Sequence, residues 1–129
     1  MISVDTNIVV RLLTGDDPEQ FQKAHALFEK EDIVITTSII LECEWVLRYA
    51  YQFKPAEIMD AFAALFGLPN VSLQEQAVIS KAIDWHKQNL DFADAIHLAK
   101  SQDYEALATF DRTFIAKAAR ITDFPVKAP

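Results

Sequence analysis

The feature that most constrains the fold is a regular alternation of short apolar runs with longer stretches of helical periodicity. The β-branched run over residues 33–36 is typical of a strand that is buried on both faces of a parallel sheet. The pattern predicts strands over residues 2–5, 33–36, 70–73 and 106–109. It predicts helices over residues 7–13, 18–31, 38–51 (with Ser38 as N-cap), 55–66, 74–86 and 92–101, and a short helix that ends at Ala118. This order predicts an α/β fold in which helices cover both faces of a mostly parallel sheet.

Length and composition are those of one globular domain over residues 1–129, with a loosely held tail at residues 124–129. The apolar share of 51% excludes a disordered chain, and the single cysteine, Cys43, excludes a disulfide scaffold. Because no run of about 18 apolar residues is present, a membrane span is not expected. The first residues lack the basic region of a signal peptide, so we expect a cytoplasmic protein.

The formal net charge is −7, from 12 basic and 19 acidic residues. That balance argues against a protein that coats DNA, since such a protein needs a basic surface. It leaves room for a nucleic-acid enzyme, because acids that hold cations present a less negative surface to the substrate.

Two acids follow predicted strands. Parallel α/β sheets bind their ligands beyond the carboxyl ends of the strands. Asp5 ends the first predicted strand, and Asp111 lies just past the strand that ends at Thr109. If both strands are central, the two carboxylates share one edge of the sheet. The alternative is that each acid only caps the helix that follows it.

Glu42 lies at the margin of an apolar helix face. At about 100° per residue, that face is formed by Ile39, Cys43, Val46, Leu47 and Ala50. Glu44 and Arg48 fall on the opposite side, which we expect to be solvated. A lone ionised carboxylate among apolar neighbours is costly unless a cation compensates it. The alternative is a buried salt bridge to Arg11 or Arg48, but because Arg48 falls on the other side we favour a functional site.

Asp94 repeats this pattern on the helix over residues 92–101, where it borders the apolar side next to Leu98. Asp91 stands three residues earlier, as the expected N-cap, from where it could support a site. Clustered carboxylates repel one another unless cations are present. Oxygen ligands without a cysteine or histidine cluster indicate Mg²⁺ or Mn²⁺ rather than zinc. Cys43 faces the apolar core and is expected only to pack there.

Four motifs then stand in order along the chain: Val4-Asp5-Thr6-Asn7, Thr37-Ser38-Ile39-Ile40-Leu41-Glu42, Asp91-Phe92-Ala93-Asp94-Ala95-Ile96-His97-Leu98-Ala99, and Ala108-Thr109-Phe110-Asp111. With them the chain resembles the PIN-domain family, and within it the VapC-type toxins of type II toxin–antitoxin pairs. The resemblance implies a three-layer α/β/α sandwich and a Mg²⁺- or Mn²⁺-dependent endoribonuclease. It also implies a catalytic and metal-binding quartet with supporting residues. These are Asp5, Glu42, Asp94 and Asp111, supported by Thr6, Asn7, Thr109 and Asp91.

The implied chemistry is metal-assisted hydrolysis of an RNA phosphodiester. Asp5, Asp94 and Asp111 would hold the first ion, and Glu42 would position or deprotonate the attacking water, or share in holding metal. The cation would stabilise the charge that develops on phosphorus. Because water attacks rather than the 2′-hydroxyl, we expect 5′-phosphate and 3′-hydroxyl ends.

The remaining expectations concern RNA and protein partners. Candidate phosphate contacts are Arg11, Lys54, Lys87 and Arg112. Trp85 and His86 could stack on a base, although Trp85 also fits a core position.

The resemblance implies an RNA substrate (tRNA among the candidates), a cognate antitoxin whose basic tail lies over the acidic site, inhibition of translation, and a homodimer. Residues 38–66 carry more large apolar side chains than one covering layer needs, so some could form a groove for a partner helix. These are Trp45, Tyr49, Tyr51, Phe53, Met59, Phe62 and Phe66. The alternative is that all of them are core.

Two other functions compete. A receiver-like Mg²⁺-binding signalling domain would have paired acids after the first strand and a lysine after a late one. Here Asp5 is followed by Thr6 and Asn7, and no lysine stands beside Asp111. The second alternative is a catalytically inactive PIN-like binding module, against which the complete quartet argues.

Overall fold

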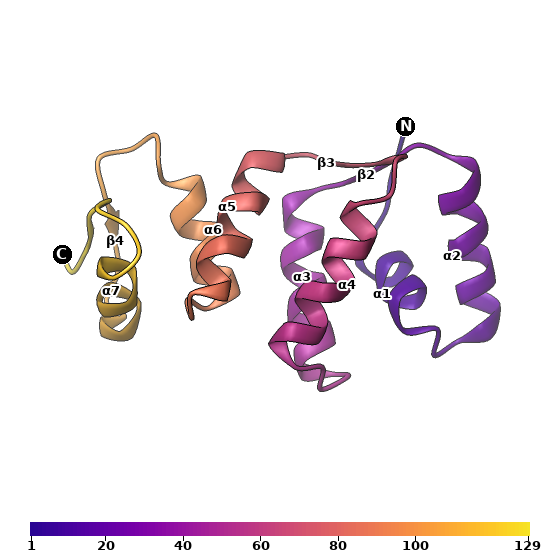
Figure 1. Cartoon of the computed structure of the whole chain (residues 1–129), viewed down its shortest axis with the longest axis horizontal. Helices are drawn as coiled ribbons and strands as arrows, with labels where there is room; N and C mark the ends of the chain where they lie inside the picture. The colour runs from indigo at the N-terminus through magenta and orange to yellow at the C-terminus, as the bar shows by residue number, and fades with distance from the viewer. The chain divides into compact units, whose positions relative to one another are not determined.

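The computed structural model describes residues 1–129, and the chain divides into two compact units. We call these the N-terminal unit, Met1–Glu75, and the C-terminal unit, Gln76–Pro129. Along the chain, one or two helices separate each strand from the next, as Figure 1 traces by colour. No helix has both the length and the apolar character that crossing a bilayer requires.

The N-terminal unit is built on a three-stranded parallel sheet in the order β1-β2-β3. Its strands are β1 (Ile2–Ser3), β2 (Ile33–Ile35) and β3 (Val71–Leu73), and its helices are α1 (Thr6–Thr14), α2 (Pro18–Lys30), α3 (Thr37–Tyr49) and α4 (Pro55–Phe66). The middle strand pairs with both neighbours, with Ile2 opposite Ile33 and Ile33 opposite Val71. Ile33 and Ile35 are fully buried, as the β-branched run predicts for a central strand.

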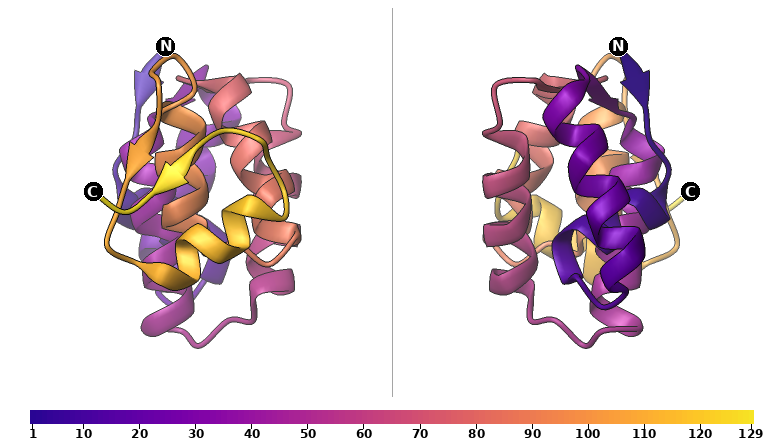
Figure 2. Two further views of the ribbon diagram at one scale, coloured as in Figure 1. Left: turned by 90° about the vertical axis from the view of Figure 1, so that its left-hand side faces the viewer. Right: turned by 90° about the vertical axis from the view of Figure 1, so that its right-hand side faces the viewer.

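Helix contacts in this unit connect the motifs to one another. α1 packs against α2 and α3, while α4 packs against α3 and β3. Figure 2 (right) shows α2 running beside α1. Since Asp5 precedes α1 and Glu42 lies on α3, the contact between α1 and α3 joins the first two motifs.

The C-terminal unit contains α5 (Gln76–Lys87), α6 (Phe92–Lys100), β4 (Leu107–Ala108), α7 (Arg112–Ala119) and β5 (Val126–Lys127). α5 and α6 pack closely together, and α7 packs against β5. Their buried side chains form the core of this unit: Ile79, Ala82, Trp85, Phe92, Ala95, Ile96, Leu98 and Phe114. β4 and β5 form a two-stranded parallel sheet (Figure 2, left).

The predicted α/β class with parallel strands is confirmed, because every strand pairing in both units is parallel. Two local predictions are wrong. The tail at residues 124–129 is not loose but supplies β5, because the backbone of β4 needs partners: Leu107 N–H donates to Pro125 O at 2.9 Å and Thr109 N–H to Lys127 O at 3.0 Å. Ser38 is not an N-cap, since α3 begins at Thr37 and Thr36 takes the N-cap position.

Candidate active site

Asp5 follows β1 and is the N-cap of α1. Its side chain is exposed, and one carboxylate oxygen accepts the Ile8 backbone N–H at 3.3 Å. Asp5 therefore follows a strand, as predicted, and it also caps the next helix, as the alternative predicts. The unpaired N–H groups at a helix start carry partial positive charge, which favours a carboxylate there.

Thr6 connects Asp5's helix to Glu42. The Thr6 side chain is buried, and its hydroxyl donates a hydrogen bond to Glu42 Oε1 on α3. Glu42 itself is exposed at the margin of its helix. The predicted alternative of a salt bridge to Arg11 or Arg48 does not occur, since Arg11 pairs with Asp16 and Arg48 with Glu44.

Glu44 lies in a different environment from the one that the sequence predicts. It was expected on a solvated face, but its exposure is only 2%, and Arg48 donates to it from Nε at 2.8 Å and from Nη2 at 3.1 Å. The reason is that α3 contacts both α1 and α4, so side chains on more than one side of the helix are covered. The hydrogen bonds from Arg48 compensate the buried charge, and they raise the pKa of the Arg48 guanidinium.

Cys43 lies fully buried beside the first two motif residues. Its Sγ lies 4.0 Å from Thr6 O. Burial, and to a smaller extent the carboxylates of Glu42 and Asp5, raise the pKa of the thiol to about 12. The thiol therefore stays neutral and packs in the core, which agrees with the prediction. The shift also places both carboxylates in the electrostatic surroundings of one buried atom.

The C-terminal unit carries the other two acids of the quartet. Asp91 caps α6 as predicted, accepting the Asp94 N–H at 3.2 Å. Asp111 caps α7, accepting the Phe114 N–H at 3.0 Å, and donates its own N–H to Thr109 Oγ1 at 3.1 Å. Thr109 thus fixes the backbone at Asp111.

Asp94 is half-buried on α6. Burial raises the pKa of its carboxyl, and the negative charges of Asp91 and Asp111 raise it further. His97 and Lys117 act in the opposite direction. Asp94 and Asp111, predicted to act together, therefore do influence one another within this unit.

Lys117 is a member of this cluster that sequence reasoning missed. It lies on α7, three residues after the buried Phe114 and one before the buried Ala118. That position at the border of the buried stripe was the available signal, because a long side chain there can extend toward neighbouring groups.

The chemistry of the donors suits a hard divalent cation, because all four predicted ligands offer carboxylate oxygens. In neither unit do three His, Cys, Asp or Glu side chains gather closely enough to hold a metal ion. The N-terminal unit carries Asp5 and Glu42, and the C-terminal unit carries Asp94 and Asp111. Each unit thus supplies half of the predicted ligand set.

The four predicted RNA contacts differ in exposure and in side-chain hydrogen bonding. Lys54, Lys87 and Arg112 are exposed, and Arg112 directly follows Asp111. Arg11 is instead engaged in several side-chain hydrogen bonds. Asn7, beside Thr6, is exposed.

Trp85 and His86 are not available as base-stacking platforms in this structure. Trp85 is 2% exposed, so the core alternative is confirmed. The His86 ring uses Nδ1 in a 2.7 Å hydrogen bond with Leu90 O and meets Phe92 edge-on.

Of the apolar side chains over residues 38–66, Trp45 and Tyr49 are exposed, at 56% and 60%. Their ring centroids lie 5.2 Å apart on α3. Met59 and Phe62 are buried, and the other three are partly covered. The core alternative therefore holds for Met59 and Phe62 but not for the Trp45–Tyr49 pair.

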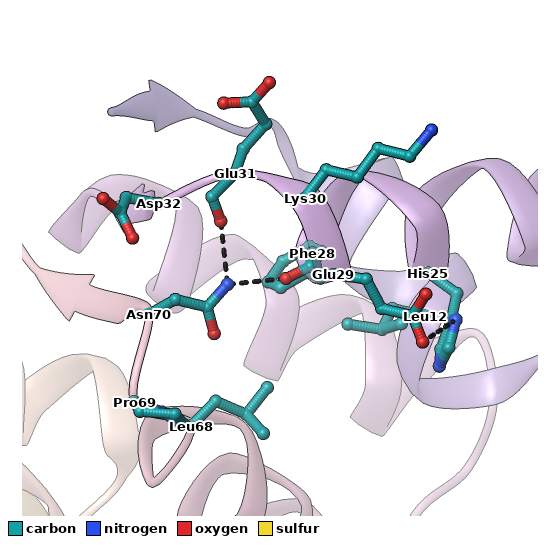
Figure 3. A pocket seen from close by; sticks show the side chains of 10 residues that line it. All are labelled: Leu12, His25, Phe28, Glu29, Lys30, Glu31, Asp32, Leu68, Pro69 and Asn70. Carbon is teal, nitrogen blue, oxygen red and sulfur yellow. Dashed lines mark hydrogen bonds and ion pairs between the residues drawn. The ribbon is translucent and has the colours of Figure 1, made fainter.

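Two hollows of similar size mark the N-terminal unit. One, of about 460 Å³, lies at the end of α2 and is lined by residues that include His25, Phe28, Leu68 and Asn70 (Figure 3). Asn70 donates there to Phe28 O and Glu31 O, which ties the end of α2 to the start of β3. That hollow contains none of the predicted site residues. The other, of about 420 Å³, includes Asp5, Asn7 and Arg11.

Comparison with known proteins gives a family match and a weak structural likeness. The family model described as "PIN domain" matches residues 2–120. The crystal structure of Mycobacterium tuberculosis VapC20, a toxin that cleaves the sarcin–ricin loop, is 19% identical, with a TM-score of 0.45 over 90% of this chain and 94% of that one. No curated protein matches the sequence.

Proposed function

The chain belongs to the PIN domain family, and from that premise we propose that it is a Mg²⁺- or Mn²⁺-dependent endoribonuclease. The family is typically one of nucleases, and its α/β/α fold is the fold class predicted from the sequence. The receiver-like alternative is thereby set aside. Because the family match runs through both units, we propose that residues 1–129 form one PIN-like domain.

The observation that carries the proposal is the environment of Asp94, which is half-buried on α6 and influenced by the acids Asp91 and Asp111. Its pKa is raised by burial and by Asp91 and Asp111, so the ionised form is disfavoured where it stands. Such an arrangement costs stability unless a cation offsets it, and active sites are where clusters of this kind are retained. The same motif carries the resemblance to metal-dependent nucleases.

We propose that Asp5 and Glu42 act together with Asp94 and Asp111, and that these four carboxylates hold the divalent ion. When bound, the ion would supply stabilisation of the negative charge that develops on the scissile phosphate. Thr6 holds Oε1 of Glu42, which leaves Oε2 to accept a proton from the attacking water. Attack by water rather than by the 2′-hydroxyl would leave 5′-phosphate and 3′-hydroxyl ends.

The proposal extends to the biological role. The VapC-type motifs support a toxin that inhibits translation in the cytoplasm by cutting RNA, with tRNA among the candidates. A cognate antitoxin with a basic tail fits a chain of net charge −7. The exposed Trp45–Tyr49 pair supports a protein partner, and we propose a homodimer.

The test is cleavage of RNA by the purified protein with Mg²⁺, with Mn²⁺ and with EDTA. Asp5→Asn should abolish cleavage, whereas Asp60→Asn, which changes an exposed acid on α4, should not. Sequencing the 5′-phosphate ends formed after induced expression identifies the RNA target. Cleavage that survives both EDTA and Asp5→Asn would contradict the proposal, and RNA binding without cleavage would favour the inactive binding module.

A further inference from the structure

The hollow that includes Asp5 lies between α1 and α2, and its wall carries two cations. Arg11 lines it from α1 and Lys23 from α2, and the buried Ala24 also lines it. Asn7 and Gln20 add side-chain amides. The volume of about 420 Å³ falls in the range of small-molecule sites.

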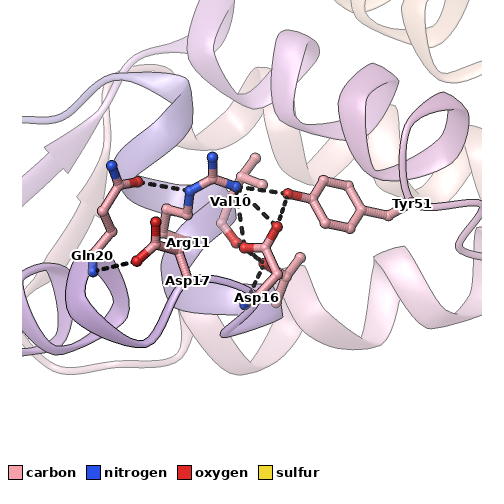
Figure 4. Close-up of polar contacts among 7 residues, drawn as sticks. Val10, Arg11, Asp16, Asp17, Gln20 and Tyr51 are labelled. Carbon is pink, nitrogen blue, oxygen red and sulfur yellow. Dashed lines mark hydrogen bonds and ion pairs between the residues drawn. The ribbon is translucent and has the colours of Figure 1, made fainter.

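Arg11 is held rigidly at this groove. Its Nε donates to Gln20 Oε1 at 2.8 Å, and its Nη1 lies 3.1 Å from both Asp16 carboxylate oxygens and 2.8 Å from the Tyr51 hydroxyl. In Figure 4 no dashed line joins Nη2 to any of the residues drawn. A guanidinium fixed on one edge with its remaining donors free is prepared to bind an anion, because little side-chain entropy remains to be lost.

The partners of Arg11 are themselves linked. The Tyr51 hydroxyl donates to Asp16 Oδ2 at 2.6 Å, and Thr14 donates to Asp16 Oδ1 at 2.9 Å. The bond from Tyr51, then that from Thr14, lowers the pKa of Asp16, and the Arg11 charge adds to them. Tyr51 therefore connects the segment after α3 to the turn between α1 and α2, and it acts on the groove only through Arg11.

Lys23 is much less constrained. Its ammonium lies 3.2 Å from Glu19, and the two side chains are 76% and 80% exposed. An ion pair so exposed to water is weak, so Lys23 can exchange Glu19 for another anion.

We propose that this groove is a nucleotide-binding subsite. It holds a nucleotide that flanks the scissile phosphodiester, with its phosphate bound by Arg11 and Lys23. The inference rests on the proposed function, because Asp5 stands at the groove and an RNA strand passing Asp5 extends into it. Two cations and two amides match the phosphate and base edges of a nucleotide. The amides and the adjoining acid favour RNA over an acidic peptide.

The test separates binding from cleavage. A fluorescein-labelled single-stranded RNA 20-mer of randomised sequence is titrated with Asp94→Asn protein, which keeps the groove, at several salt concentrations. In that background Lys23→Ala should weaken RNA binding by about three- to fivefold. The slope of the logarithm of the binding constant against the logarithm of salt concentration should become shallower by about 0.7. Arg11→Lys keeps the charge but loses the planar fork, so it should also weaken binding. Lys30→Ala, an exposed lysine on the same helix outside this groove, is the matched control.

Tyr51→Phe tests the positioning role in the cleaving protein. It should raise KM about two- to threefold without lowering kcat, because it loosens Arg11 and leaves the acids intact.

If the wild-type protein binds RNA through Arg11 and Lys23 but does not cleave it, the proposed function fails and the subsite stands. The subsite is overturned if RNA does not bind, or if Lys23→Ala and Arg11→Lys match the Lys30→Ala control. It is equally overturned if a 20-residue polyglutamate competes as well as unlabelled RNA and loses affinity in the same variants.

Discussion

At the scale of single residues, the four acids of the quartet are held in three ways. Asp5 and Asp111 each accept a backbone N–H at the start of a helix, which fixes their direction. Glu42 is held by the hydroxyl of Thr6 instead. Asp94 has acidic neighbours and is partly buried, so it is the member whose ionised form is disfavoured. These differences give each acid its own test.

Thr6→Val is expected to separate activity from stability. Valine keeps the shape of the buried side chain but removes the donor to Glu42. The kcat for RNA cleavage should fall about tenfold, while the free energy of unfolding changes by only about 1 kcal/mol. Thr6→Ser should restore most of the rate. Full activity in Thr6→Val beside an inactive Glu42→Gln would show that Thr6 does not position Glu42.

Asp94→Asn should stabilise the metal-free protein at neutral pH. Because the folded-state pKa of Asp94 is raised, its ionisation costs folding stability above the usual aspartate pKa, and the cost disappears at low pH where the group is protonated in both states. The melting temperature in EDTA should rise by a few degrees at pH 7 and stay unchanged near pH 3. Asp103→Asn, another exposed acid of the same unit, serves as control. A rise in melting temperature that persists at pH 3 would mean that removal of the Asp94 charge is not the cause.

At the scale of elements, local patterns predicted most of the fold. α4 has the predicted bounds of residues 55–66, because Pro55 can begin a helix and the apolar stripe defines its length. β5 was missed because Val126 and Lys127 have no strand pattern of their own and pair only where β4 offers a free edge. Helix periodicity likewise placed Glu44 in solvent, since a helical wheel cannot show how many elements surround the helix.

The sequence likewise predicts the local positions of the candidate site residues but not their contacts with distant segments. Strand ends and helix margins identified its acids, because these positions follow from local structure. Contacts between distant segments were not predictable, as in the hydrogen bond from Thr6 to Glu42 or from Arg11 to Tyr51. A single sequence records which residues are present but not which side chains meet after folding.

Arg48→Met tests the buried ion pair of α3. It leaves the Glu44 carboxylate buried at 2% exposure without a partner. Urea denaturation should show a loss of about 3 kcal/mol in the free energy of unfolding. The double variant Glu44→Leu with Arg48→Met should recover much of that loss, because the uncompensated charge is gone. The exposed Arg120→Met is the control. Equal stability of Arg48→Met and Arg120→Met would refute a structural role for the pair.

At the scale of the whole molecule, we propose that the four acids of the quartet hold one divalent ion. The family match runs from residue 2 to residue 120 and so includes motifs from both units. Neither unit gathers three metal ligands by itself, and each carries two of the four acids.

The most direct test of the proposed ion site is a Mn²⁺ titration. Binding is monitored as the decrease in the electron paramagnetic resonance signal of the free ion. Asp5→Asn in the N-terminal unit and Asp94→Asn in the C-terminal unit should each weaken Mn²⁺ binding by about tenfold or more. Combining them should add less than the two separate losses, because one shared ion is affected, and Asp60→Asn should bind like the wild type. Wild-type affinity in either Asp5→Asn or Asp94→Asn would contradict a cation held by the quartet.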